Sequence, residues 1–394
     1  MKKNLILLLV IVSIGTLLTV IYANSRASSR TEIFSSYSLL ESSWQKYKQE
    51  FILPEGRVID PSQNDMTTSE GQSYAMLRAV WIDDKPTFDL VWNWTKDNLN
   101  REQDNLYGWR WGLLENGSYG FLENGGENSA TDADTDIALA LIFAANRWNQ
   151  NEYREEAKPI LTDLWNLTTE EVNGKRYALA GSWATSQTDL VLNPSYFAPY
   201  AWRIFADVDT DNDWESLIDP AYEVLRLSSS QPLNGKDATG LPPNWVMLRK
   251  QDGQLIGPTQ PGLTEQYSYD AMRTPWRIAV DYHWFQEPQA LEYLESMSIL
   301  GEKYREDGFL ASTYEHDGTR VTEYESPAMY ATALPYFQFV EPETAQELYQ
   351  NKVLVLYDND TNAFREDLNY YDQNWLWFSM ALYNDSLPNL AQKE

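Results

Sequence analysis

Between residues 38 and 385, hydrophobic residues recur with a helical period in stretches separated by loops rich in Gly, Pro, Asn and Asp. In residues 134–148, for example, Ile137, Leu141, Ala145 and Trp148 fall on one face of a helix. The pattern predicts roughly a dozen helices, at residues 37–51, 69–81, 88–99, 134–148, 151–167, 194–206, 213–228, 270–284, 288–303, 326–337, 341–353 and 372–384.

Short stretches typical of β-strands lie in the connections between these helices, at residues 107–114, 176–183, 246–256 and 308–314. We expect them to form hairpins on a helical body. No internal repeat is visible, and antiparallel helices can stack in several ways. Periodicity alone therefore predicts an all-α domain but does not say how its helices are arranged.

The first residues have the pattern of an export signal. Lys2 and Lys3 precede an uncharged, largely aliphatic run from Asn4 to Asn24. This run exceeds the roughly 7–15 apolar residues of a cleaved signal peptide and approaches the ~20 that span a bilayer. A retained membrane anchor is therefore favoured over cleavage after Ala23, with the body of the chain outside the cytoplasm. We predict an anchor or signal segment with a short tether at residues 1–36, followed by one domain at residues 37–394.

The chain carries a formal net charge of −28, from 30 basic and 58 acidic side chains. Such a charge excludes nucleic acid as a partner and leaves the N-terminal segment as the only expected membrane contact. Cysteine is absent and only two histidines occur, which excludes a disulfide framework, a thiolate nucleophile and a histidine-rich metal centre. Aromatic residues make up 14% of the chain, including 16 Trp and 25 Tyr. The surplus over core packing is typical of a groove that stacks on sugar rings.

Glu70 follows good capping residues at the start of the predicted helix 69–81. The helix dipole alone would lower its pKa. Burial against Tyr74 and Trp111, or a nearby carboxylate, would raise the pKa and keep the side chain protonated at neutral pH. Glu70 is thus either an ordinary first-turn glutamate or a general acid.

Asp132, Asp134 and Asp136 occupy alternating positions where the next apolar helix begins. An EF-hand loop that began at Asp132 would need glycine at the position of Ile137 and glutamate at that of Phe143, so this calcium motif is absent. A second acidic run over residues 207–213 also lacks the closing glutamate. Helix capping explains one acid per helix well and three poorly. We predict no metal site.

Asp270 and Arg273 lie one helical turn apart, so the guanidinium can hold the carboxylate in its ionised form. A structural ion pair is the alternative. Together with a protonated Glu70, an ionised Asp270 would supply the two opposite protonation states that glycoside hydrolysis requires. Trp109 and Trp111 would point to one side of an extended segment, where they could line a cleft or simply pack.

These motifs resemble glycoside hydrolase family 8, a family of inverting endo-glycanases. The acidic signature matches from Ala130 through Trp148, and further matching motifs follow in the expected order at residues 69–74, 109–111, 194–199, 269–273, 275–277 and 370–372. The resemblance extends over most of residues 38–385. It implies an (α/α)6 barrel of inner and outer helices with an open acidic cleft, and makes residues 37–394 a glycoside hydrolase catalytic domain that needs no metal or organic cofactor.

The resemblance also implies roles for individual side chains, carried over by motif match. The implied catalytic residues are Glu70 as general acid, Asp270 as general base and Asp132 at the scissile sugar. The implied substrate-binding residues are Asp134 beside Asp132, Trp111 as a stacking platform, and Tyr196, Tyr269 and Arg273 as a polar ring.

The implied activity is endo-hydrolysis of a β-1,4-glucan such as cellulose. Asn244 stands where an aspartate is expected in many relatives, and the predicted anchor differs from freely secreted cellulases. Xylan, chitosan or an amino-sugar exopolysaccharide therefore remain alternative substrates. An anchored enzyme outside the membrane could trim a nascent exopolysaccharide, which would make a polysaccharide synthase complex a partner. A non-catalytic polysaccharide-binding protein is the alternative from another functional class.

Overall fold

The computed structural model describes residues 37–392, so the predicted anchor and tether at residues 1–36 lie outside the described residues. Residues 37–51 are helical. The further α-helices are α2 (Ser69–Ile82), α3 (Lys85–Asn98), α4 (Thr131–Arg147), α5 (Asn151–Thr168), α6 (Pro199–Val208), α7 (Ile218–Ser230), α8 (Thr274–Phe285), α9 (Pro288–Ser296), α10 (Ile299–Asp307), α11 (Pro327–Val340), α12 (Pro342–Leu348) and α13 (Tyr370–Tyr383).

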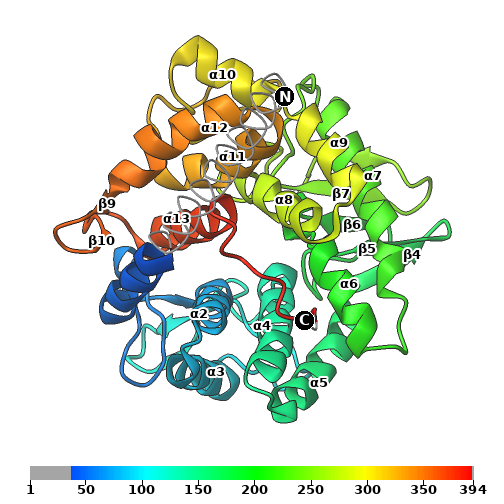
Figure 1. Cartoon of the computed structure of the whole chain (residues 1–394). Helices are drawn as coiled ribbons and strands as arrows, with labels where there is room; N and C mark the ends of the chain where they lie inside the picture. Colours follow the sequence, from blue (N-terminus) through cyan, green and yellow to red (C-terminus); the bar gives the residue numbers. More distant parts are fainter. Residues whose placement is uncertain (1–36, 393–394) are drawn as a thin grey trace, which may run out of the picture.

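The helices form a ring in which inner and outer helices alternate along the chain (Figure 1). The inner helices are buried on nearly every side; in α2, all residues except Glu70 are buried. An outer helix such as α5 instead buries one stripe, at Tyr153, Ala157, Ile160 and Leu164. The predicted (α/α)6 barrel is therefore confirmed. Burial in α4 extends beyond the face of Ile137, Leu141 and Ala145, because Thr131 to Ala145 are buried throughout.

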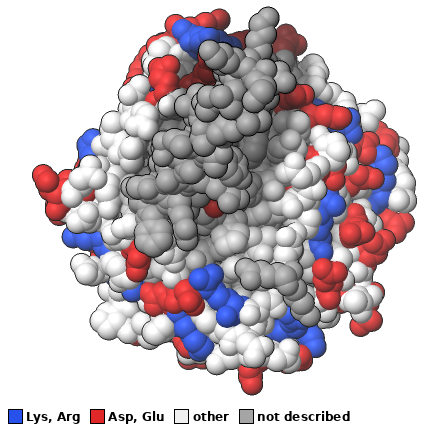
Figure 2. Space-filling model, in the orientation of Figure 1, with Lys and Arg blue, Asp and Glu red and all other residues white. Residues whose placement is uncertain are grey.

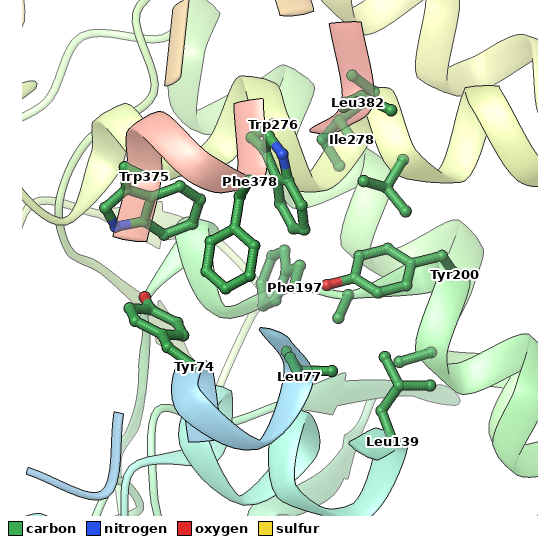
Figure 3. Packing of buried hydrophobic residues seen from close by; sticks show 14 of the residues in the cluster. Tyr74, Leu77, Leu139, Phe197, Tyr200, Trp276, Ile278, Trp375, Phe378 and Leu382 are labelled. Atoms are coloured by element: carbon green, nitrogen blue, oxygen red, sulfur yellow. The ribbon is translucent and has the colours of Figure 1, made fainter. Parts of the chain in front are cut away.

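The centre of the ring is filled by large aromatic side chains (Figure 3). Tyr74 of α2 meets Trp375 and Phe378 of α13 edge-on, with ring centroids 5.5 and 5.3 Å apart. Trp276 of α8 contacts the same two rings at 5.5 Å each. Three inner helices that are far apart in sequence therefore pack through one aromatic cluster, which fixes their relative positions.

A buried ion pair joins α4 to α8. Arg277 donates from its two terminal nitrogens to the two carboxylate oxygens of Asp136, at 2.9 and 2.8 Å. The same guanidinium donates to the Tyr200 hydroxyl at 2.9 Å. Both charged side chains are almost completely buried. This geometry offsets the desolvation cost of two ions because each oxygen receives its own N–H.

The strands are short and lie in the connections, as predicted. They pair in antiparallel sheets. The strands are β1 (Thr67–Thr68), β2 (Arg110–Leu113), β3 (Tyr119–Phe121), β4 (Thr169–Val172), β5 (Lys175–Ala178), β6 (Asp189–Leu192), β7 (Val246–Arg249), β8 (Leu255–Ile256), β9 (Tyr357–Asp358) and β10 (Ala363–Phe364). The strand predicted at 308–314 is wrong: this segment makes only isolated bridges, and these do not form a ladder. They join Tyr267 to Tyr314, Ala311 to Glu325 and Tyr314 to Arg320.

Several predicted helices begin or end at other residues in the structure. The helix predicted at 194–206 begins at Pro199, because residues Pro194–Tyr196 form a separate 3₁₀ turn capped by Asn193. Proline is accepted in the first turn of a helix, where its missing N–H is not needed. The helix predicted at 288–303 is two helices, α9 and α10, separated at Met297 and Ser298.

After α13 the chain crosses the ring toward α4 (Figure 1). Backbone carbonyls of this segment accept hydrogen bonds from side chains near the C-terminal ends of the inner helices. Trp81 donates to the carbonyl of Pro388 at 3.1 Å, Trp284 to that of Leu387 at 2.8 Å, and Asn146 to that of Leu390 at 3.0 Å. The C-terminal segment therefore covers the end of the barrel at which the inner helices finish.

Acidic side chains are spread around the rim of the face drawn in Figure 2, interspersed with fewer Lys and Arg side chains. This distribution is typical of a charged, soluble surface. Within residues 37–392, none of the helices is both long enough and apolar enough to cross a membrane.

The Arg277–Asp136 pair generates a stability prediction. Asp136→Leu leaves the buried guanidinium without its carboxylate and should lower the free energy of unfolding by about 3–5 kcal/mol. The double variant Asp136→Leu/Arg277→Met, which removes both charges, should be destabilised by clearly less. Urea denaturation at pH 7 measures both. Equal losses in the two variants would contradict a charge-based account of this contact.

Candidate active site

The functional side chains predicted from the sequence come from the N-terminal ends of inner helices. Glu70 is the second residue of α2 and Asp132 the second residue of α4. Asp270 and Arg273 belong to the 3₁₀ turn that leads directly into α8. Because helix N-termini carry partial positive charge, this end of the barrel favours carboxylates.

Local contacts hold Glu70 at the helix start. The Thr68 hydroxyl caps α2 by accepting the backbone N–H of Gly71 at 2.9 Å. A side chain at position 71 would crowd this region, because a Cβ there would lie 3.2 Å from the Tyr370 ring and 3.3 Å from the Thr68 hydroxyl. Glycine therefore lets Tyr370 approach, and its hydroxyl donates to Glu70 Oε1 at 3.4 Å.

Arg273 is the centre of the site. One terminal nitrogen donates to Glu70 Oε2 at 2.6 Å and to Asp132 Oδ2 at 2.9 Å. The other donates to Asp270 Oδ1 at 2.7 Å and to the Ser195 hydroxyl at 3.2 Å. Only 3% of the Arg273 side chain is exposed. A single buried cation thus brings three carboxyl groups together from α2, α4 and the turn before α8.

The Glu70 carboxyl has an environment that favours its protonated form. Burial raises its pKa to about 7, against the lowering effect of the Arg273 guanidinium. The negative charges of Asp132 and Asp270 raise the pKa further. Burial and neighbouring carboxylates thus outweigh the helix dipole, and Glu70 carries a proton at and below neutral pH for a large fraction of the time.

The Asp270 carboxyl is the most accessible of the three. About a third of its side chain is exposed (32%), compared with 21% for Glu70 and 3% for Asp132. Its Oδ2 accepts a hydrogen bond from the Trp245 indole at 3.2 Å. The surrounding protein raises the pKa of Asp270 by desolvation, while Arg273 lowers it. Its exposure in the pocket leaves Asp270 within reach of solvent water.

The three alternating aspartates of α4 have three different partners. Asp132 binds Arg273, and Asp136 binds Arg277 one turn further into the barrel. Asp134 does not reach the group around Arg273. It is fully buried, and its Oδ1 accepts the backbone N–H of Tyr107 at 2.9 Å. Asp134 therefore does not occupy the sugar-binding position expected beside Asp132, because its side chain supports the segment before β2.

The predicted aromatic residues divide into two groups. The Tyr196 ring lies under the Arg273 guanidinium, 5.2 Å from ring centroid to Cζ, and Tyr269 is 47% exposed at the pocket. Trp111 lies in β2 and stacks on Tyr119 of β3, with centroids 5.0 Å apart and ring planes 15° apart. Trp94 packs edge-on against Trp111 at 5.1 Å. Trp111 is therefore partly covered by its own chain.

A cavity of about 320 Å³ opens in front of the carboxyl groups. Glu70, Asp270 and Arg273 line it on one side, and residues of the loop before β1 line it on the other. The full lining is Asp60, Ser62, Gln63, Glu70, Tyr269, Asp270, Arg273, Asn369, Tyr370 and Tyr371. Within residues 37–392, no group of three or more His, Cys, Asp or Glu side chains is placed to hold a metal ion.

Several site residues were missed by sequence reasoning. Trp245 contacts Asp270, Ser195 contacts Arg273, and the Tyr371 hydroxyl donates to the Tyr269 carbonyl at 2.7 Å. Ser195 and Tyr371 do stand in the matching motifs at residues 194–199 and 370–372, and Trp245 follows Asn244 in the sequence. Their contacts depend on tertiary packing, for which the sequence pattern carries no signal.

The chain is similar to known glycoside hydrolases. The profile of Glycosyl hydrolases family 8 matches residues 14–356. Endoglucanase 2 of Ruminiclostridium josui is 31% identical over 375 residues, which cover 90% of this chain and 73% of that protein. An endoglucanase of Cellulomonas uda is 34% identical over 248 residues, and this match spans 62% of this chain and 64% of the relative's length.

The fold is also that of solved structures. The endo-1,4-D-glucanase from Vibrio fischeri ES114 superposes with a TM-score of 0.73 at 25% identity, covering 87% of this chain and 94% of that one. The family match over most of the chain, the barrel fold and the cluster of carboxyl groups agree. This chain belongs to glycoside hydrolase family 8.

Proposed function

We propose that this protein is an endo-acting, inverting hydrolase of β-1,4-glucan, with Glu70 as general acid and Asp270 as general base. The observation that carries the proposal is that one guanidinium binds both carboxyl groups at the mouth of one pocket. Burial raises the pKa of Glu70 to about 7, which suits a group that must donate a proton near neutral pH.

The hydrogen bonds around Glu70 indicate which oxygen carries the proton. Oε2 accepts an N–H from Arg273 and so acts as an acceptor. Oε1 accepts a long hydrogen bond from the Tyr370 hydroxyl, at 3.4 Å, and the Tyr74 hydroxyl also acts on this carboxyl; we assign the proton to Oε1 because its bond is the weaker of the two. As the glycosidic C–O bond breaks, this proton passes to the departing oxygen, so the leaving sugar departs as a neutral alcohol.

Asp270 acts on the opposite face of the sugar. Its carboxylate accepts a proton from a water molecule while the water oxygen bonds to the anomeric carbon, which leaves a free sugar end and a protonated Asp270. Inversion requires about 6.5–9.5 Å between the two carboxyl groups, enough for a sugar and a water. Side chains that bind different nitrogens of one guanidinium are close enough to act on the same bond.

The remaining site residues would bind the glycan. Asp132 is almost completely buried, so we assign it to fixing Arg273 and to sugar contact only at its exposed edge. Tyr269 and Arg273 line the pocket, and Tyr196 packs beneath the guanidinium. Trp111 would extend the aromatic surface together with Tyr119, whose ring is 55% exposed.

The relatives named endoglucanases support β-1,4-glucan as substrate. Xylan, chitosan or an amino-sugar exopolysaccharide is the alternative within the same reaction class. Reducing-sugar release from carboxymethylcellulose, lichenan, xylan and chitosan separates these possibilities. Highest activity on carboxymethylcellulose supports the proposal, and activity confined to xylan or chitosan would redirect it to those polymers.

The N-terminal sequence supports a place of action outside the cytoplasm. The uncharged run from Asn4 to Asn24 has the composition of an export or anchor segment. An anchored enzyme would meet polysaccharide as it leaves a synthase, so we propose the producer's own exopolysaccharide as a natural substrate. Better activity on foreign soluble glucans than on that exopolysaccharide would argue against this role.

Replacing the general acid generates the first catalytic prediction. Glu70→Gln keeps the shape of the side chain and removes its acidic proton, so kcat on carboxymethylcellulose should fall by about 10²–10⁴-fold. Affinity for cello-oligosaccharides should stay nearly unchanged, as measured by calorimetry. Glu292→Gln, on the exposed side of α9, is the matched control and should keep wild-type turnover. Unchanged kcat in Glu70→Gln would remove Glu70 from the mechanism and favour a polysaccharide-binding protein.

The stereochemistry of the product is a second prediction. An inverting enzyme that cleaves a β-linkage releases the α-anomer first, before mutarotation. Proton NMR of a cello-oligosaccharide digest, recorded within the first minutes, should show the α-anomeric signal growing ahead of the β-signal. Initial release of the β-anomer would mean a covalent intermediate and would contradict the role given to Asp270.

A further inference from the structure

Asn244 lies next to the site in the segment Pro242-Pro243-Asn244-Trp245 that leads into β7. The side chain is buried, with 5% exposure. Its Oδ1 accepts the backbone N–H groups of Ser268 at 3.2 Å and Ala271 at 2.9 Å. Its Nδ2 donates to the hydroxyls of Ser268 at 2.7 Å and Thr264 at 3.2 Å. Every hydrogen bond of this amide therefore goes to the segment that ends in Asp270 and Ala271.

The hydrogen bonds of the Asn244 side chain reach the backbone on both sides of Asp270. The two N–H groups that Oδ1 accepts belong to residues on either side of Asp270 in the chain, Ser268 and Ala271. The neighbouring residue Trp245 donates its indole N–H to the Asp270 carboxylate at 3.2 Å. Both the backbone and the carboxylate of Asp270 are thus positioned by two consecutive residues.

Backbone hydrogen bonds and the strand β7 hold the segment that carries Asn244 and Trp245. The backbone N–H of Asn244 donates to the Gln266 carbonyl at 2.7 Å, and that of Trp245 donates to the Thr264 carbonyl at 3.0 Å. The following residues enter β7, the central strand of the sheet β6–β7–β8. Asn244 thus lies close to a sheet strand, whereas residues 264–271 belong to no strand. These residues are joined to residues 244–245 by the two bonds just given and to Tyr314 by an isolated bridge at Tyr267.

We propose that Asn244 is a positioning residue for the general base: its uncharged amide fixes the 268–271 turn so that the Asp270 carboxylate faces the pocket. This inference rests on the proposed function for the role of Asp270. None of the side-chain hydrogen bonds of Asn244 goes to a residue that lines the pocket, so its effect on Asp270 passes through this turn.

The Asn244 amide fixes the 268–271 turn without adding a charge near the carboxyl groups. An aspartate at position 244 could still accept both N–H groups, and its second oxygen could accept from the two hydroxyls after they rotate. It would, however, add a negative charge beside Asp270. The charged and titratable groups that already face Asp270 are Arg273 and Glu70 at the same pocket, Asp132 of α4, Tyr196 before α6 and Tyr371 of α13.

Two variants test this role through kinetics. Asn244→Ala removes all four bonds, and we expect kcat to fall by about 10²-fold with little change in KM, because a displaced base affects the chemical step. Asn244→Asp restores the accepted N–H bonds, so we expect most of kcat to return near neutral pH, where Glu70 still carries its proton. The added charge raises the pKa of Asp270, so activity should begin to fall at a higher pH than in the wild type as the pH is lowered.

Asn384→Ala is the matched control, because Asn384 also makes side-chain hydrogen bonds, to Tyr349 and Met380 far from the pocket. It should keep wild-type kcat. Wild-type kcat in Asn244→Ala would overturn the proposal. Equal losses in Asn244→Ala and Asn244→Asp, with an unchanged pH profile, would also overturn it, since they would indicate a merely structural contact.

Hydrogen exchange tests the bonds between Asn244 and the 268–271 turn without relying on activity. In Asn244→Ala, the amides of Ser268 and Ala271 should exchange at least about tenfold faster, because their acceptor is gone, while amides within α8 keep their protection. Unchanged exchange at both positions would overturn the proposal. If the wild type hydrolysed none of the four polymers, the proposed function would fail, whereas the exchange result would still decide whether Asn244 holds the turn.

Discussion

The active site depends on one buried cation. Arg273 is 3% exposed and binds Glu70, Asp132 and Asp270 at the same time. Without it, three carboxyl groups near each other in a desolvated region would repel, and their charged forms would be strongly disfavoured. With it, burial that raises the pKa of Glu70 is opposed by a guanidinium that lowers it. The proposed division between acid and base therefore depends on where this guanidinium is held.

The ion pair between Arg273 and Asp132 has a counterpart one helical turn deeper in the barrel, between Arg277 and Asp136. Asp132 and Asp136 are four residues apart on α4, and Arg273 and Arg277 are four residues apart at the start of α8. Each arginine binds one aspartate of α4, so the two elements are joined by two successive ion pairs. The deeper pair is closed off by Tyr200 and the aromatic cluster around Trp276, and the upper pair opens to the pocket. Arg273 of the upper pair lines the pocket to which we assign the chemistry, whereas the deeper pair is buried.

The sequence predicts the helical elements and much of the site, for identifiable reasons. Helix periodicity and breakers located nearly every helix, and capping residues correctly placed Glu70 at a helix start. The alternating aspartates looked like one functional group from their spacing. The structure separates Asp134 from the other two, because helix positions two apart point about 200° apart, whereas positions four apart share a face. Asp134 consequently binds the Tyr107 backbone and not the pocket.

Other features had no local signal. The resemblance supplied Trp111 as a platform, yet its stacking on Tyr119 depends on the register of β2 and β3. The contact of Trp245 with Asp270 and the bonds of Asn244 join segments that are more than twenty residues apart. Pairings of this kind are set by tertiary packing, which neither periodicity nor capping encodes. The sequence shows asparagine at position 244 where an aspartate is expected in many relatives. Its hydrogen bonds to the 268–271 turn are seen only in the structure.

The central claim is that Glu70 remains protonated close to neutral pH beside an arginine. Carbon-13 NMR of protein labelled at glutamate carboxyl groups, with Glu70→Gln used for assignment, measures this directly. The account predicts one carboxyl signal that titrates near pH 7, is missing in Glu70→Gln, and reports the protonated form below that pH. A Glu70 signal that titrates near 4.5, the ordinary value, would show that Arg273 outweighs burial and would contradict the account.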